Sequence, residues 1–214
     1  MLPPTPTRLN LTDQPLASGD EIVETMIEGT QPPESIAHGV RLRDCVVKKA
    51  TFTAAKLIKA YLTNVTFGET SLAGTSLAEC SLDRVTFAAC RLTGTVFSDG
   101  RLEDCAFSGS AANLSMFRFS SLKNVQFRDC NLKGVDFTEA RLKRVTFVGC
   151  DLEGADFSHA KLDRVDLRGS SLADLRGIDG LRGAIISSEQ LIGLSFALAG
   201  VVGIEVSDGN RNEL

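Results

Sequence analysis

The sequence predicts an all-β solenoid with a short helical cap at its N-terminal end and one helix at its C-terminal end. Three observations support this fold class. Every fifth residue from Leu42 to Leu172 is almost always large and apolar, the position two residues earlier holds small side chains, and all six prolines lie before residue 34. Of the 27 positions at this interval, 15 are Leu and 10 are Phe. A period of five fits neither a helix nor a long strand, so the chain must turn every five residues.

Residues 1–39 are interpreted as an N-terminal arm and cap, because proline cannot join stacked strands. Ser18 and Glu21 have the spacing of a capping box, and a helical apolar stripe begins at Ile22 and stops at Gly29. We expect a short acidic helix that covers the open edge of the first coil. A mobile arm that binds a partner is the alternative.

Residues 40–176 are interpreted as the coils. If each pentad is one short side of a coil, one large and one small residue fill the interior and the other three face outward. Backbone groups then bond to the coils above and below. Cysteine fills the small inner position six times, at Cys45, Cys80, Cys90, Cys105, Cys130 and Cys150.

These six cysteines always fall in the small inner position, and their spacings are all multiples of five. We interpret them as buried, reduced thiols that act as small apolar side chains, with redox or metal chemistry as the alternative. Cys130 and Cys150 are expected to stack on successive coils. They are the first pair to check for a bridge, although the expected geometry is unfavourable.

The segment CDLEGADFSHAKLDRVDL at 150–167 resembles the pentapeptide repeat family, whose consensus A(D/N)LxX has Leu or Phe at its centre. The resemblance extends in unbroken phase from Leu42 to Leu172. It implies a right-handed quadrilateral β-helix with four pentads in each coil, and therefore nearly seven coils. The central residues alternate between Leu and Phe from 82 to 162, except at Ala112, which predicts Phe stacks on two opposite faces.

Residues 177–214 are interpreted as a C-terminal capping or dimerisation helix with a tail. Ser187 and Gln190 form a capping box that opens a helix over 188–199, and a short strand is expected at 204–206. The helix is apolar over most of its circumference, which suggests a second buried face besides the one that covers the coil. It resembles the dimerisation element of gyrase-interacting family members, which implies a homodimer; simple capping is the alternative. The candidate dimer interface is Leu191, Leu194, Phe196 and Leu198.

Composition favours a binding protein over an enzyme. The chain has 214 residues, of which 43% are hydrophobic, and it contains only two His and no Trp. No phosphate-binding glycine loop or cluster of metal ligands is apparent, so we expect no catalytic residues, no cofactor and no metal. It also lacks a run of 18 apolar residues and an N-terminal signal peptide, so we expect a cytoplasmic protein that contacts no membrane.

The net charge of −4 is unevenly distributed. Residues 41–175 carry 19 basic and 16 acidic side chains, whereas the first 40 residues and the C-terminal segment are acidic. The face centred on Leu42 and its successors at intervals of 20 holds a candidate basic patch: Arg141, Lys143, Arg144, Lys161 and Arg164. Acidic residues are interspersed on the same face, so we interpret it as a solvated mixed surface and do not expect direct nucleic-acid binding.

The segment 108–121 departs most from the repeat. Ala112 underfills its central position, while Leu114, Met116 and Phe119 fall at positions expected to face outward. One interpretation is a local bulge that packs these side chains into the gap. The other is an exposed apolar contact site.

The best-known role of the family is binding to type II topoisomerases, especially DNA gyrase, by a rod that imitates duplex DNA. The resemblance therefore implies a non-enzymatic partner of gyrase that modulates it or protects it from quinolones or other poisons. A general protein-interaction scaffold with an unrelated partner is the alternative. The candidate partner surface is Glu79, Asp99, Asp136, Glu139, Asp156, Met116 and Phe119.

Overall fold

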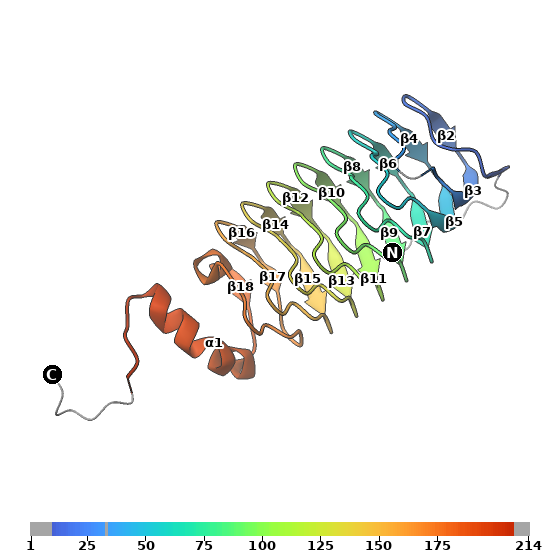
Figure 1. Ribbon diagram of the computed structural model, residues 1–214. Helices are drawn as coiled ribbons and strands as arrows, with labels where there is room; N and C mark the ends of the chain where they lie inside the picture. Colours follow the sequence, from blue (N-terminus) through green and yellow to red (C-terminus); the bar gives the residue numbers. More distant parts are fainter. Residues whose placement is uncertain (1–9, 33, 208–214) are drawn as a thin grey trace.

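The computed structural model describes residues 10–32 and 34–207, which form a parallel solenoid followed by one α-helix (Figure 1). Residues that pair across neighbouring strands are 20 positions apart, as Leu62 is from Leu82 and Phe67 from Phe87. One coil therefore contains four pentads, and the four-sided coil implied by the family resemblance is confirmed. We number its faces in chain order, beginning with the face centred on Leu42.

The first and second faces carry the two sheets. The first face holds eight strands, one from each of eight coils: β2 (Glu21–Val23), β4 (Arg41–Arg43), β6 (Tyr61–Thr63), β8 (Ser81–Asp83), β10 (Arg101–Glu103), β12 (Ser121–Lys123), β14 (Arg141–Lys143) and β16 (Lys161–Asp163). The second face holds ten strands: β1 (Asn10–Thr12), β3 (Thr25–Thr30), β5 (Val46–Thr51), β7 (Thr66–Gly68), β9 (Thr86–Ala88), β11 (Ala106–Ser108), β13 (Gln126–Arg128), β15 (Thr146–Val148), β17 (Val165–Asp166) and β18 (Ala184–Ile185).

The third and fourth faces are held by single bridges between coils, such as Ser71 to Arg91 on the third and Ser76 to Val96 on the fourth. A tight turn follows the central residue on these faces. The amide of Thr75, for example, donates to the carbonyl of Leu72 at 2.9 Å. All four sides thus satisfy their backbone groups, as stacked coils require.

The core is built from stacked identical side chains. On the second face the Phe87 and Phe107 rings are stacked with centroids 4.7 Å apart, and on the fourth face Phe97 and Phe117 are stacked at the same distance. Rings of the two faces meet edge to face, as Phe97 meets Phe107 at 6.0 Å. The predicted Phe stacks on opposite faces are confirmed, and both stacked and edge-to-face contacts are favourable geometries for aromatic rings.

The corner residue, two positions after each central residue, adopts positive φ throughout the coils. Glycine accepts this left-handed backbone without a steric penalty, and Asp and Asn accept it more readily than other side chains. Most corners hold such residues or long polar side chains. Leu114 and Phe119, with φ of 58° and 59°, are the bulky apolar exceptions among the described corners.

The predicted N-terminal helix is wrong. Its residues instead form β2 and β3, in which Ile22 pairs with Leu42 and Ile27 pairs with Val47. The apolar residues here are five positions apart and in phase with the repeat, so pairing with the adjacent coil outweighs the helical stripe. A helix this short has little stability of its own. Ser18, expected to cap that helix, accepts a hydrogen bond from the amide of His38 at 3.0 Å.

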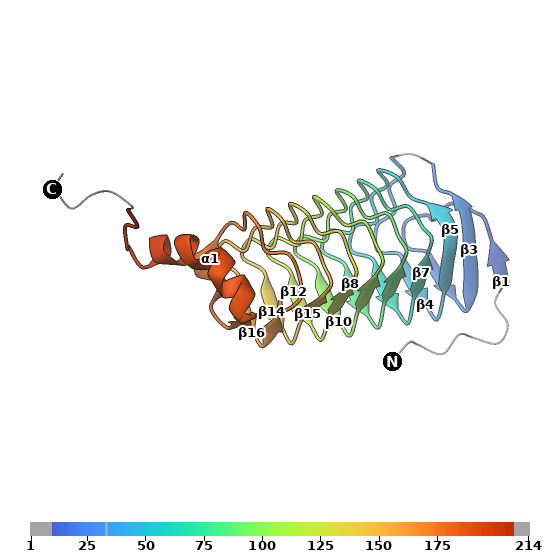
Figure 2. The ribbon, with the colours of Figure 1, turned by 90° about the horizontal axis from the view of Figure 1, so that it is seen from below.

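The C-terminal end is closed by a 3₁₀ turn, η1 (Ile178–Leu181), and by α1 (Ser188–Val201), which lies across the last coil (Figure 2). The predicted capping box is confirmed, since the Ser187 side chain accepts from the Gln190 amide and the Gln190 side chain accepts from the Ser187 amide. The Gln190 amide group also donates to the carbonyls of Leu167 and Ser170, both at 2.8 Å. One side chain therefore caps both the helix and the open edge of the solenoid.

The expected strand at 204–206 is wrong, because this segment has no strand partner and its side chains are exposed. Among the residues that the structure describes, no helix is long and apolar enough to cross a membrane.

Candidate functional site

An exposed apolar band crosses the fourth face on a single coil. Its members, Leu114, Met116 and Phe119, are 59, 40 and 52% exposed. Met116 pairs in register with Val96 on the preceding coil and with Asp136 on the next one. Because the pairing continues without interruption, the alternative of a packed bulge in this segment is wrong. We call these three residues the apolar band.

The backbone does not favour the two outer members of the band. Leu114 and Phe119 occupy left-handed corners, where a bulky side chain costs on the order of 1 kcal/mol. Burial does not offset this cost, because both side chains are more than half exposed. Large apolar side chains that are both strained and exposed are typical of positions kept for contact with another molecule.

Leu114 projects from the rod because the residues at the same corner of the two adjacent coils have no side chain. The equivalent residues on the adjacent coils are Gly94 and Gly134. A Cβ atom added to Gly134 would lie 3.0 Å from Leu114 Cδ2, so the leucine side chain rests on this glycine. Leu114 is therefore a fixed apolar projection at this edge of the fourth face.

Acidic neighbours flank the other end of the band. The equivalent corners on the adjacent coils place Asp99 before Phe119 and Glu139 after it. Neither carboxylate takes part in an ion pair within the described part of the chain. Phe119 thus lies between two negative charges that remain available to cations of a partner.

The other three acidic residues of the candidate partner surface are paired. Glu79 lies 3.3 Å from Lys59, Asp136 lies 2.9 Å from Arg118, and Asp156 lies 3.6 Å from Arg176. These pairs compensate most of the negative charge that the sequence places on the fourth face. The face therefore presents localised charge at Asp99 and Glu139 and no continuous acidic stripe.

Asp156 is additionally held in its ionised form. Partial burial raises its pKa, but hydrogen bonds from Ser158 and the charges of Arg176 and Arg118 outweigh burial, so that the pKa of Asp156 is lowered. The Ser158 amide donates to Asp156 Oδ1 at 2.9 Å. His159 occupies the next corner, on an exposed convex edge. This arrangement offers no enclosed site for catalysis.

The interior beneath the apolar band is unusually polar. Ala112 replaces the larger central residue, and the inner small positions of this coil are Ser110, Ser115 and Ser120. The Ser115 hydroxyl donates to the carbonyl of Ala112 at 2.6 Å, and Ser110 and Ser120 likewise donate to backbone carbonyls. All three hydroxyls are therefore satisfied.

The basic patch lies along the C-terminal part of the first face. A shallow trough of about 290 Å³ runs between two rows of outward side chains on β12, β14 and β16. Arg141 and Lys161 line one side, and Lys143 lies on the other at 3.5 Å from Asp163. Arg164 lies 3.7 Å from Asp163 as well. The structure brings these basic residues together, but acidic side chains compensate part of their charge.

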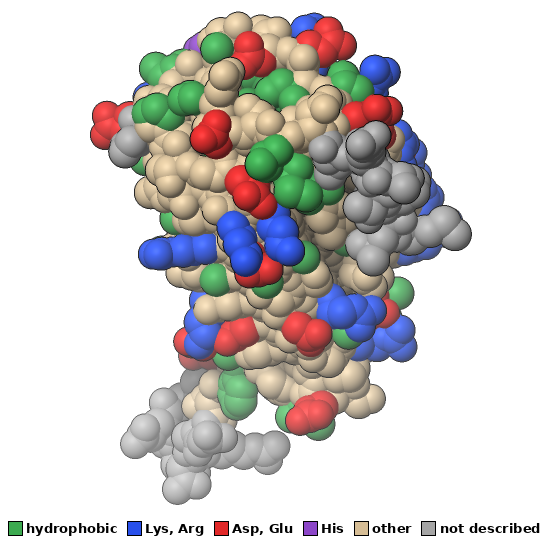
Figure 3. Space-filling view, turned by 90° about the vertical axis from the view of Figure 1, so that its right-hand side faces the viewer, with side chains coloured by type: hydrophobic (Ala, Val, Ile, Leu, Met, Phe, Trp, Pro, Cys, Tyr) green, Lys and Arg blue, Asp and Glu red, His purple; other side chains and the backbone are tan. Residues whose placement is uncertain are grey.

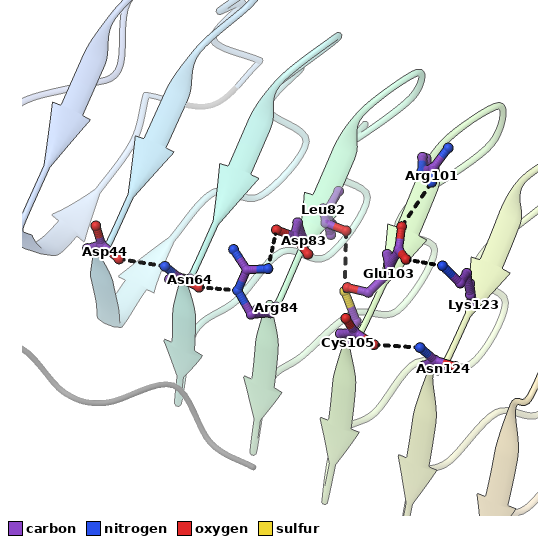
Figure 4. A network of polar contacts seen from close by, with 11 residues as sticks. Asp44, Asn64, Leu82, Asp83, Arg84, Arg101, Glu103, Cys105, Lys123 and Asn124 are labelled. Atoms are coloured by element: carbon purple, nitrogen blue, oxygen red, sulfur yellow. Dashed lines mark hydrogen bonds and ion pairs between the residues drawn. The ribbon is translucent and has the colours of Figure 1, made fainter.

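Arg144, the fifth member of the patch, belongs to a chain of corner residues. Its Nε donates to Asn124 Oδ1 at 2.6 Å, and the Asn124 amide group donates to Asp104 at 2.7 Å. The same arrangement occurs three coils earlier, in Asp44, Asn64 and Arg84. Figure 4 shows the earlier chain beside Glu103, which receives hydrogen bonds from Lys123 and Arg101. These bonds lower the pKa of Glu103 to about 2.

The end of the rod viewed in Figure 3 shows basic and acidic side chains interspersed with apolar ones. The ion pairs on the first and fourth faces likewise place basic side chains beside acidic ones. On the face that Figure 3 shows, basic and acidic side chains lie close together.

The candidate dimer interface is divided between two sides of α1. Leu194 is buried and Leu198 is half-buried against the last coil, where Ile178, Leu181 and Ile186 also pack. Phe196 lies on the side of the helix away from the coil and is 72% exposed, whereas Leu191, three residues before Leu194, lies at the border of the packed side and is 50% exposed. Ile192, Val201 and Val202 are exposed too. The helix thus has one apolar side that covers the solenoid and a second apolar side that no other described residue covers.

All six cysteines are free and buried, as expected of small apolar residues in the inner position. Burial raises the pKa of Cys80 and Cys105 to about 12 and that of Cys90 to about 11. These thiols remain protonated at neutral pH and are poor nucleophiles. Within the described residues, no three His, Cys, Asp or Glu side chains are placed to hold a metal ion.

Comparison with solved structures supports the fold. A trypsin-treated variant of QnrB1, described as a plasmid-mediated fluoroquinolone resistance protein, is 20% identical, with 92% of this chain and 95% of that chain covered and a TM-score of 0.52. HetL, a pentapeptide repeat protein involved in heterocyst differentiation regulation in the cyanobacterium Nostoc sp. strain PCC 7120, is 17% identical, with 80 and 91% covered and a TM-score of 0.38. No curated protein matches the chain.

A family model for the pentapeptide repeat region matches residues 38–117 and 120–176, which is well over half of the chain. The match spans the stacked coils in which every four pentads complete a turn. On this combined basis, the chain belongs to the pentapeptide repeat family.

Proposed function

We propose that this protein is a non-enzymatic binding protein whose partner is a type II topoisomerase, DNA gyrase in particular. The observation that carries the proposal is the apolar band, three exposed apolar side chains on one coil, with Asp99 and Glu139 on either side of Phe119. A projecting Leu and Phe suit apolar pockets of a protein surface, and the two free carboxylates suit nearby cations. The carboxylates would repel the phosphates of a nucleic acid.

The choice of gyrase rests on two supports. Family resemblance implies binding to type II topoisomerases, and the fold is shared with QnrB1, which is described as a fluoroquinolone resistance protein. In this proposal the protein acts in the cytoplasm and modulates gyrase or protects it from quinolones or similar poisons. Because most acidic residues of the fourth face are paired, recognition depends on the apolar band more than on imitation of the charge of DNA.

A scaffold for an unrelated protein partner is the second candidate. The ion pairs of Glu79, Asp136 and Asp156 favour it, since a rod that imitates DNA should present unpaired negative charge at regular spacing. The apolar band would serve such a partner equally well.

Supercoiling by purified gyrase distinguishes the two candidates. We expect micromolar protein to inhibit supercoiling or to restore it in the presence of ciprofloxacin, with an inert protein of similar mass as control. Cleavage complexes stabilised by the drug should decrease in the same range. An unchanged reaction with and without drug would exclude gyrase as the partner and favour the scaffold.

We further propose that the protein is a homodimer joined through the uncovered side of α1. Exposed Ile192 and Phe196 on the far side of the helix, with Leu191 at its border, form a surface that is too apolar to be solvated. A second copy of α1 is the simplest occupant, because the same apolar surface on both chains is self-complementary about a two-fold axis. Leu194 and Leu198 then serve to fix each helix to its own solenoid.

Light scattering tests the dimer. We expect the intact chain to have about twice the mass of one chain, and a variant with Leu191, Ile192 and Phe196 all changed to Ser to have the mass of one. Since these side chains are exposed, the circular dichroism of the variant should match that of the parent. Glu189→Gln, in the first turn of the same helix, is the control and should remain dimeric. A single-chain mass for the parent protein would refute the dimer.

A further inference from the structure

Cys130 and Cys150 occupy neighbouring coils in one column of inner positions. Asn131 pairs with Asp151, and the Asp151 amide donates to the carbonyl of Cys130 at 3.0 Å, which fixes the two cysteines one directly above the other. They are 2 and 3% exposed. The other four cysteines have non-cysteine residues above and below them in their columns.

The contacts of this pair differ from those of the other cysteines. The thiols of Cys45, Cys80, Cys90 and Cys105 contact a carbonyl oxygen 23 residues earlier, at 3.0 to 3.6 Å. All six thiols contact the carbonyl two residues earlier, at 3.3 and 3.6 Å for Cys130 and Cys150, but among the described residues these two make no contact with a carbonyl 23 residues earlier, and their side chains hydrogen bond to each other instead. The pair is therefore turned inward along the column.

The spacing of the coils is compatible with a covalent bond between these sulfurs. Neighbouring strands lie about 4.8 Å apart. The Cα atoms of disulfides are separated by about 4.4 to 6.8 Å. The Cβ atoms of a disulfide are only about 3.5 to 4.5 Å apart, whereas parallel side chains in register are separated by about the strand spacing. This is the unfavourable element that the sequence predicts, and closure therefore draws the two coils together by roughly 1 Å at this column.

We propose that Cys130 and Cys150 form a peroxide-sensitive dithiol that closes into a disulfide and joins two successive coils. The oxidant is hydrogen peroxide or a small organic hydroperoxide, which reaches the buried pair through local opening of the coil edge. This role is independent of the identity of the binding partner.

The chemistry proceeds in two balanced steps. The Cys130 thiolate attacks one peroxide oxygen, so that an S–O bond forms, the O–O bond breaks and hydroxide leaves to take up the released proton as water. The sulfur of Cys150 then attacks Cys130, so that the S–S bond forms, the S–O bond breaks and the second water leaves with the Cys150 proton. Two thiols are oxidised to one disulfide, and one peroxide is reduced to two waters.

The hydrogen bond within the pair supports the order of these steps. The Cys150 thiol donates to Cys130 and lowers the pKa of Cys130, although burial opposes this effect. The same hydrogen bond, together with burial, raises the pKa of Cys150. Cys130 is accordingly the better nucleophile toward peroxide, and Cys150 is the resolving thiol.

Thiol counting on the intact, folded protein tests the proposal. After exposure to hydrogen peroxide and denaturation, the count should fall from six to four, with a mass lower by two hydrogens, and dithiothreitol should restore six. Cys130→Ser and Cys150→Ser should each retain all five remaining thiols. Cys90→Ser, in the same column, is the matched control and should fall from five to three. Serine fits this position, since Ser110 and Ser170 already occupy the column.

Peptide mapping identifies the bonded pair. A cross-link between the peptides that contain Cys130 and Cys150 is the expected result. An unchanged count of six thiols, a mass increase by oxygen atoms, or a cross-link that persists in Cys130→Ser would each overturn the proposal.

Discussion

Replacing Phe117 by Ala is expected to lower the free energy of unfolding by about 3–5 kcal/mol. The Phe117 ring is fully buried, and it stacks on Phe97 at 4.7 Å and on Phe137 at 5.2 Å. It also meets Phe107 and Phe127 edge to face, at 6.2 and 6.0 Å. The cavity cannot collapse, because backbone hydrogen bonds fix the distance between coils and the interior is close-packed.

Urea denaturation followed by circular dichroism measures this effect. The matched control is Phe119→Ala, which removes the same ring two residues later on the same coil, where the side chain is exposed. We expect the control to remain within about 1 kcal/mol of the parent protein. Equal destabilisation by the two substitutions would show that the stacked rings of the fourth face do not determine stability. The contrast thus separates inner from outer positions within one pentad.

The interior of the coils could be predicted from the sequence because inner and outer positions repeat without a shift. Once Phe and Leu alternate every five residues, a four-sided coil places Phe87 beneath Phe107 and Phe97 beneath Phe117, and the rings stack there. The same regularity placed Leu114, Met116 and Phe119 on the outside. The exposed state of the apolar band follows directly from its phase in the repeat.

The wrong prediction of an N-terminal helix has a physical reason. A stripe that includes Ile22, Met26 and Ile27 fits a helix, but Ile22 and Ile27 also continue the five-residue phase. Local pattern alone does not decide between them. The exposed edge of the first complete coil offers backbone partners to a strand, and these long-range hydrogen bonds outweigh local helix propensity.

The electrostatics of the candidate site could not be predicted from charge counts. Asp136 pairs with Arg118, which is 18 residues away and on the preceding coil, and Glu79 pairs with Lys59 in a similar way. These pairs depend on which side-chain rotamers meet across a coil step. Asp99 and Glu139 occupy the same corner position as Glu79, yet among the described residues Glu79 is paired with Lys59 whereas Asp99 and Glu139 have no ion pair.

The sequence pattern likewise could not predict which side of α1 packs on the solenoid and which side is exposed. Apolar residues surround most of the helix, so the sequence indicates two buried sides without assigning Leu191 or Leu194 to either. The assignment is made by Gln190, which bonds to the last coil and thereby fixes the rotation of the helix. Leu194 then turns inward and Phe196 outward, with Leu191 at the border between the two sides.

Changing both Leu114 and Phe119 to Gly is expected to reduce affinity for the partner by at least about 30-fold, because projecting apolar anchors contribute about 2 kcal/mol or more at protein interfaces. Stability should change by no more than about 1 kcal/mol. Each glycine relieves a strained left-handed corner, and this gain offsets the greater freedom of glycine in the unfolded chain. Binding and stability should therefore respond separately to the same pair of substitutions.

Titration against immobilised gyrase, with urea denaturation in parallel, tests this separation. The matched control is Lys49→Gly with Glu69→Gly, since these residues occupy left-handed corners with φ of 51° on another edge of the rod. The control should bind as the parent does. If both double variants lose affinity equally, corner rigidity rather than the apolar band explains binding. If the Leu114 and Phe119 variant binds normally, the strained apolar side chains have no part in recognition, and the observation that carries the proposed function fails.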